Sequence, residues 1–178
     1  MIATNDDDTA QSLKMIRTHG EERPYWVTML GSNYRMTEIQ AAIGIAQLQK
    51  LPRFQEIREK NVKMLSEGLE PVKALQLPIP AEGIQHAWHL YTVRLKGANA
   101  GKRNKLLSKL RSKRISTGVY YETPVHLLPY YRNTLGSRKT LLPKTEKAAR
   151  QVFSLPVHPK LTPEEIDYMV KHLARFLV

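Results

Sequence analysis

Nine basic residues and no acidic residue fall within residues 94–114, and this run limits what the middle of the chain can become. Leu106, Leu107 and Leu110 repeat inside it at helical spacing, which predicts an amphipathic helix over about residues 101–114. One face of that helix packs on a core and the other is very basic. A basic outer face suits a solvated surface, phosphate contacts to nucleic acid, or attraction of an anionic small substrate.

The composition is that of a globular chain. Of 178 residues, 42% are hydrophobic, and 28 Lys and Arg against 16 Asp and Glu give a formal net charge of +12. The absence of cysteine excludes disulfide scaffolds, cysteine-ligated zinc, iron–sulfur clusters and thiol nucleophiles. No apolar run approaches the roughly 20 residues that span a bilayer, and the first residues lack the pattern of a secretory signal. We therefore expect a cytoplasmic protein with no membrane partner.

Local signals predict a mixture of helices and strands. Thr37 and Gln40 form a capping box before the Ala-rich segment 38–51, which Pro52 is expected to break or kink. Gly44 within that helix suggests that another backbone approaches closely, and residues 20–36 are expected to form an aromatic loop. Further helices are expected after Asn5 or Asp6 and at about 53–69, 143–152 and 163–177, and strands at 1–4, 88–95, 115–121 and 152–155.

Common catalytic motifs are missing from the sequence. It contains no P-loop, no G-x-G-x-x-G, no G-x-S-x-G and no H-E-x-x-H. His86 and His89 are placed on opposite faces of the expected strand, which makes them a poor pair of metal ligands. His126 lies in a Pro-rich loop between two Tyr-Tyr pairs, where aromatic rings and an imidazole suit contact with a sugar or heterocycle. The residues alone thus predict a basic α+β domain that binds an anionic ligand.

Four blocks of the sequence together resemble one family. Residues 31–48 read GSNYRMTEIQAAIGIAQL and resemble the G-x-N-x-R-M…E-x-x-A-A-x-x-x-x-Q-L block of the DegT/StrS pyridoxal-phosphate-dependent sugar aminotransferases. Later blocks of that family are similar, in the same order, to HAWHLYTVRL (86–95), ISTGVYYETPVHLLPYY (115–131) and SLPVHPKLTPEEID (154–167). The stretch ATNDDDTAQSLKMIRTHG (3–20) is similar to the segment after the family's cofactor-binding strands, so the resemblance covers the whole chain.

The resemblance implies a fold-type I aminotransferase architecture, of class α/β (α+β). It implies that residues 1–51 are a helical remnant of the large cofactor-binding domain, including its dimer-interface segment. Residues 52–178 would then be the C-terminal small α/β domain. The Schiff-base lysine of the family lies upstream of the block that opens this chain, so we expect no catalytic residue here and no covalently bound cofactor.

Four site residues follow from the resemblance, position by position. Asn33 matches the family asparagine that reaches across the dimer to the cofactor phosphate, and Arg35 matches the adjacent arginine. Tyr121 and His126 match the family loop that contacts the nucleotide sugar. Many relatives have histidine where this chain has Tyr120.

The implied activity belongs to the intact enzyme: amino transfer from an amino acid such as glutamate to a keto sugar on a nucleotide, with pyridoxal 5'-phosphate as cofactor. The resemblance also implies a homo-oligomer and a role in polysaccharide biosynthesis. We expect this chain to be inactive alone. The alternative is a stand-alone basic module that binds nucleic acid or an acidic partner in a regulatory role, and the family blocks make nucleic acid the less favoured partner.

Overall fold

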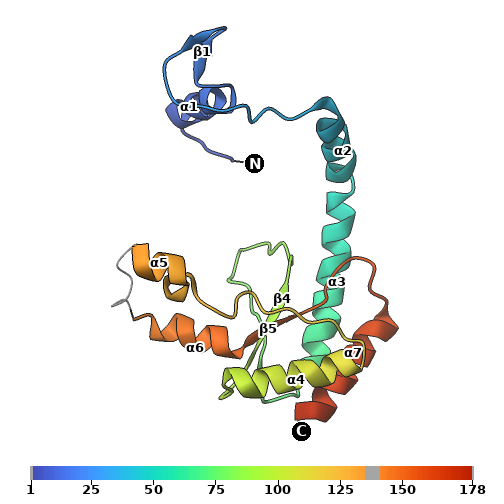
Figure 1. Cartoon of the computed structure of the whole chain (residues 1–178). Helices are drawn as coiled ribbons and strands as arrows, with labels where there is room; N and C mark the ends of the chain where they lie inside the picture. Colours follow the sequence, from blue (N-terminus) through green and yellow to red (C-terminus); the bar gives the residue numbers. More distant parts are fainter. Residues whose placement is uncertain (1, 135–140, 178) are drawn as a thin grey trace. The chain divides into compact units, whose positions relative to one another are not determined.

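The computed structural model describes residues 2–134 and 141–177 (Figure 1). The chain divides into two compact units, residues 1–51 and 52–178, called unit 1 and unit 2. The expected mixed α/β class is confirmed. No helix in the described ranges is both long and apolar enough to cross a bilayer.

Unit 1 begins with helix α1 (Asp7–Arg17), whose N-cap is Asp6, as expected. The Asp6 side chain accepts a hydrogen bond from the backbone N–H of Thr9. Helix α2 (Glu38–Leu48) begins with the predicted capping box, because Thr37 and Gln40 each accept a hydrogen bond from the other's backbone N–H. The expected helix 38–51 is interrupted after Leu48, ahead of Pro52 rather than at it.

Two predictions for unit 1 are wrong. Residues 2–4 are not in a strand. The expected loop 20–36 contains an antiparallel hairpin of β1 (Glu21–Arg23) and β2 (Trp26–Val27). A Pro24–Tyr25 turn connects the two strands, and Tyr25 has a φ of +62°. The turn signal was present in the sequence, but strands this short carry no alternating pattern that would reveal them.

Unit 1 has almost no core of its own. No residue of α1 or α2 is buried. Among the described residues, nothing lies within 4 Å of a Cβ built on Gly44, so unit 1 itself provides no close backbone at this position. Large apolar side chains are instead exposed along the unit, namely Trp26, Val27, Leu30, Tyr34, Met36, Ile39, Ile43, Ile45 and Leu48.

Unit 2 is built on a small antiparallel sheet in the order β3-β4-β5. The strands are β3 (Leu75–Gln76), β4 (Tyr91–Leu95) and β5 (Val152–Leu155). Leu75 pairs with Leu95, and Tyr91 pairs with Leu155. The expected strand at 152–155 is confirmed, and the one at 88–95 is confirmed from Tyr91 onward.

Three helices pack around the core of unit 2. They are α3 (Leu51–Leu69), α4 (Ala100–Ser112) and α7 (Pro163–Leu177). The short helices η1 (Val125–Leu127), α5 (Pro129–Thr134) and α6 (Pro143–Gln151) complete the unit (Figure 1). The most buried apolar side chains are Leu65, Leu69, Tyr91, Val93, Leu110, Phe153, Leu155, Ile166 and Leu173. Four helices, α3, α4, α6 and α7, therefore match the sequence prediction within a few residues.

The expected strand at 115–121 is wrong. Its pairing is reduced to one bridge, in which the backbone groups of Gly118 and Ser154 exchange hydrogen bonds of 3.2 and 2.8 Å. A Cβ on Gly118 would lie 2.6 Å from the ring of Tyr120, so that ring folds back over the glycine. The backbone turns away there instead of continuing along β5.

The basic helix is also corrected at one position. Arg103 was expected on the very basic outer face, but its side chain is buried. It lies three, four and seven residues before Leu106, Leu107 and Leu110, so it belongs to the apolar face of α4.

Candidate functional site

A large aromatic cleft lies within unit 2, with a volume of about 1010 Å³. Clefts for small molecules range over roughly 300–1,000 Å³ and are mostly apolar with a few polar groups. The side chains that line it come from β4, the 120–131 segment, α6 and the start of β5. They are Thr92, Tyr120, Tyr121, Thr123, Pro124, Val125, His126, Leu128, Tyr131, Leu142, Thr145, Ala148, Ala149 and Val152, and we call this the aromatic cleft.

Two of the predicted site residues, Tyr121 and His126, are brought together in this cleft. Pro124 is the N-cap of η1, which turns the chain so that His126 follows Tyr121 into the same wall. The rings of Tyr120 and Tyr121 meet edge to face, with centroids 5.8 Å apart. Such a geometry is favourable for aromatic pairs and orders the wall.

His126 is held by a carboxylate that the sequence analysis did not single out. Its Nε2 lies 3.3 Å from Oε1 of Glu146, and the two side chains are only 10% and 22% exposed. This hydrogen bond is the main reason why the pKa of Glu146 is lowered from its ordinary value of 4.5. Oε1 also accepts from the backbone N–H of Leu142, so Glu146 joins the start of α6 to the imidazole.

The other predicted pair, Asn33 and Arg35, lies in unit 1. The 31–34 segment crosses the end of α1, where the backbone N–H groups of Ser32 and Tyr34 donate to Ile16 and Arg17 at 2.9 Å. Gly20 and Gly31 make the crossing possible. A Cβ on Gly20 would overlap the Met29 carbonyl, and one on Gly31 would overlap the Gly20 backbone.

Asn33 and Arg35 contact each other directly. Nε of Arg35 donates to Oδ1 of Asn33 at 3.0 Å, and the backbone N–H of Arg35 donates to the same oxygen at 3.4 Å. The pairing uses the acceptor of the amide and only one side-chain donor of the guanidinium. The amide NH₂ and the terminal guanidinium nitrogens are donors of the kind that phosphate oxygens accept.

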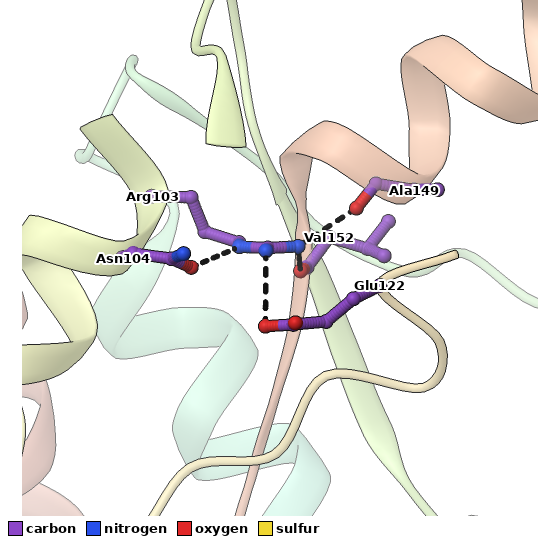
Figure 2. Close-up of polar contacts among 5 residues, drawn as sticks. All are labelled: Arg103, Asn104, Glu122, Ala149 and Val152. Carbon is purple, nitrogen blue, oxygen red and sulfur yellow. Dashed lines mark hydrogen bonds and ion pairs between the residues drawn. The ribbon is translucent and has the colours of Figure 1, made fainter. Parts of the chain in front are cut away.

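Arg103, which was expected on the outer face of α4, also bears on the cleft. Figure 2 shows its guanidinium between α6, the start of β5 and Glu122, with hydrogen bonds to all three. Nearby, Arg94 Nε donates to Gln151 at 2.6 Å, and Gln151 donates to the Ala98 carbonyl at 3.0 Å. A polar network thus fixes the C-terminal end of α6, which forms one wall of the cleft.

The remaining histidine pattern is structural. Nδ1 of His86 accepts a hydrogen bond from the backbone N–H of Trp88, and the two rings are 4.2 Å apart. In the described part of the chain no group of three His, Asp or Glu side chains could hold a metal ion.

The chain is similar to known proteins over nearly its whole length. Residues 1–174 match the DegT/DnrJ/EryC1/StrS aminotransferase family. The chain is 38% identical to the Pleiotropic regulatory protein of Geobacillus stearothermophilus, covering 99% of this chain and 46% of that protein. It is 32% identical to a dTDP-3-amino-3,4,6-trideoxy-alpha-D-glucose transaminase of Micromonospora megalomicea subsp. nigra, and the match covers 96% of this chain and 45% of that protein.

A solved structure matches the fold as well. The structure of S. venezuelae DesV in complex with a ketimine intermediate superimposes with a TM-score of 0.87 at 31% identity, over 98% of this chain and 46% of that one. The chain thus spans about half the length of the curated relatives that it matches. Because the family match extends over almost every residue, the chain belongs to the DegT/DnrJ/EryC1/StrS aminotransferase family.

Proposed function

We propose that this chain is the C-terminal part of a pyridoxal-phosphate-dependent aminotransferase that transfers an amino group from an amino acid such as glutamate to a keto sugar on a nucleotide. The observation that carries the proposal is the aromatic cleft, which Tyr121 and His126 both line. It is supported by a relative that is a dTDP-sugar transaminase. In this proposal unit 1 is a remnant of the large domain, and unit 2 is the small domain.

The cofactor's phosphate is assigned to Asn33 and Arg35. The neutral amide NH₂ and the fixed guanidinium suit a dianionic phosphate, and the 3.0 Å bond between the two side chains holds them at one place. When bound, pyridoxal phosphate supplies the electron sink for amino transfer. In the intact enzyme we expect Asn33 to reach the cofactor of a second copy, so the active form is a homodimer, and we place it in the cytoplasm.

The nucleotide sugar is assigned to the aromatic cleft. Tyrosine rings offer flat apolar faces for a sugar ring, and their hydroxyls and the His126 imidazole supply hydrogen bonds to its polar edge. Glu146 holds the imidazole from behind at 3.3 Å. His126 therefore presents a fixed orientation to the ligand, which favours binding because less rotational freedom is lost.

The lysine that bonds covalently to the cofactor is expected outside the 178 residues. A Schiff-base lysine needs a depressed pKa from burial or a neighbouring cation. No lysine among the described residues is buried. Mixing the chain with pyridoxal phosphate and borohydride should therefore label no single lysine stoichiometrically. Stoichiometric labelling of one lysine, with amino transfer from glutamate, would contradict this expectation.

The proposal is tested by reconstitution. The chain is co-expressed with the amino-terminal half of the Micromonospora transaminase or of DesV, and formation of 2-oxoglutarate from glutamate is measured with a dTDP-keto sugar. We expect activity only with both parts, and a large loss with Asn33→Ala or His126→Ala. His158→Ala is the control, because His158 is exposed and outside both assigned sites. Equal activity of all variants would refute the assigned sites.

A further inference from the structure

Arg103 is the largest fully buried side chain in the described residues, with only 1% of its surface exposed. Burial of a guanidinium is unfavourable unless its N–H groups find acceptors. The acceptors that Arg103 contacts therefore show which parts of the fold its buried guanidinium holds together. It does not itself line the aromatic cleft.

Its donors bind two different segments (Figure 2). Nη1 donates to the Ala149 carbonyl at 2.7 Å and to the Val152 carbonyl at 3.4 Å. Nη2 lies 3.4 Å from Oε1 of Glu122. Nε donates at 2.9 Å to Oδ1 of Asn104, the next residue on α4, and this bond fixes the plane of the guanidinium. Arginine suits this task because its donors diverge from a rigid plane.

Both segments line the aromatic cleft, and we call them its two walls. Ala149 and Val152 line it from the end of α6 and the start of β5. Glu122 stands between Tyr121 and Thr123, which both line it as well. The Ala149 carbonyl is among the last four of α6, which have no partner inside the helix, and a cation there also complements the helix dipole. One guanidinium thus ties both walls together from outside the cleft.

Stability alone gives little reason for the ion pair. Glu122 is 64% exposed, and an ion pair with a partner this exposed contributes little to stability. Buried ion pairs can often be replaced by apolar residues without loss. The ion pair instead fixes the position of the backbone beside Tyr121 relative to α6.

We propose that Arg103, through Glu122 and the α6 carbonyls, is a positioning residue that sets the separation of the two walls and so the placement of Tyr121 and His126 toward the nucleotide sugar. This inference rests on the proposed function for the identity of the ligand. The link between the two walls is independent of the proposed function, and hydrogen exchange can test this link without any ligand.

The experiment compares the full chain with Glu122→Gln, Arg103→Lys and the control Lys105→Met. Glu122→Gln removes the negative charge and keeps the shape of the side chain. Arg103→Lys keeps the positive charge and loses the planar guanidinium with its diverging donors. Lys105→Met removes a cation from the exposed face of the same helix. Amide hydrogen exchange at Gly118 and Leu127 reports on the tyrosine wall, and exchange in α7 reports on the global fold.

We expect Glu122→Gln to speed exchange at Gly118 and Leu127 by about fivefold. The glutamine oxygen still accepts from Arg103, but the bond loses its charge assistance, which is worth about as much as one neutral hydrogen bond. Arg103→Lys should speed exchange there and in α6, and Lys105→Met should change neither. With dTDP-glucose as the probe in titration calorimetry, both wall variants should raise Kd about fivefold while Lys105→Met keeps the wild-type value.

Wild-type exchange in both wall variants would overturn the proposal. Faster exchange that includes α7 to the same extent would also overturn it, because Arg103 would then serve only global stability. If the wild-type chain and DesV-reconstituted enzyme bind no dTDP-glucose, the proposed ligand fails, while the exchange result still decides whether Arg103 links the walls. If the variants with altered exchange bind dTDP-glucose with the wild-type Kd, Arg103 affects only the structure of the cleft, and its role in ligand placement is refuted.

Discussion

Nε2 of His126 lies 3.3 Å from Oε1 of Glu146, so a residue that lines the aromatic cleft is bonded to the first turn of α6. The bond joins two segments 20 residues apart in the sequence. It also makes the stability of this link depend on pH, because it lowers the pKa of the Glu146 carboxylate.

The pH dependence has a definite sign. The hydrogen bond with His126 lowers the pKa of Glu146 from its ordinary value of 4.5. The unfolded chain therefore takes up this proton at higher pH than the folded chain, and the stabilisation is present above pH 4.5 and lost as pH falls through the folded-state pKa. Glu146→Gln should unfold at lower urea than wild type at pH 6, and the difference should disappear as pH falls below the folded-state pKa of Glu146.

The double variant His126→Asn/Glu146→Gln provides the control for that prediction. If the two side chains act as a pair, the double variant at pH 6 should be more stable than the summed losses of the two single variants predict, and the interaction energy should vanish at low pH. A constant difference between wild type and Glu146→Gln from pH 3 to pH 7 would contradict the pairing.

Gly68 determines how closely α3 and α7 pack. A Cβ on this glycine would lie 2.9 Å from both methyl carbons of Val170, a side chain that is stiff about χ1. Gly68→Ala gains about 1 kcal/mol of helix propensity but overpacks the contact, which costs about 1–3 kcal/mol, so we expect a net destabilisation of about 1 kcal/mol. Urea unfolding measures it.

Two further variants make the Gly68 prediction specific. Val170→Ala should relieve the overpacking, so that Gly68→Ala is stabilising in that background. Gly101→Ala in the first turn of α4 is the matched control, because its Cβ would be 3.4 Å from only the side-chain oxygen of Asn99. Destabilisation of equal size at both glycines would mean that contact with Val170 is not the cause.

Unit 1 should self-associate through residues 20–48. Its apolar side chains are exposed, including Met36 and Ile43, and soluble monomers rarely expose a contiguous patch of this kind. The open space around Gly44 is where a backbone from a second copy would fit. Sedimentation at micromolar concentration should show a dimer, the commonest symmetric assembly.

Substitutions at the patch test this association directly. Met36→Glu and Ile43→Glu should each shift the chain toward monomer, and Gly44→Leu should do the same by filling the space. Ile79→Glu is the control, because Ile79 is an even more exposed isoleucine and lies in unit 2. A monodisperse wild-type monomer, unchanged by these substitutions, would refute the prediction.

The basic face of α4 should bind duplex DNA only weakly. With Arg103 buried, the exposed cations of the helix are Lys102, Lys105, Lys109 and Arg111. Contacts of this number give non-specific binding, with Kd of about 10⁻⁴ to 10⁻⁶ M at physiological salt and a steep loss as salt rises. Fluorescence anisotropy should show a shallower salt dependence for Lys105→Met/Lys109→Met. Tight, sequence-selective binding at physiological salt would favour the regulatory alternative.

Signals within a few residues determined the helices of this protein. The capping box of Thr37 with Gln40 forms as the sequence predicts, and Thr162 and Glu165 make the same reciprocal bonds before α7. Both are local because their hydrogen bonds join residues three apart. The apolar stripe of α7 likewise follows from its helical spacing. The prediction of Asn33, Arg35, Tyr121 and His126 as a site came from resemblance to a family and remains a prediction.

Only the tertiary structure decided which residues far apart in the sequence contact each other. The 115–121 segment has the composition of a strand, yet it pairs with β5 only at Gly118, because the Tyr120 ring folds back over it. Arg103 looked like one more surface cation, but its register on α4 places it inward, where acceptors 46 and 19 residues away satisfy it. Local patterns fix which face a residue occupies, whereas its partners depend on segments that come together only when the sheet and helices pack.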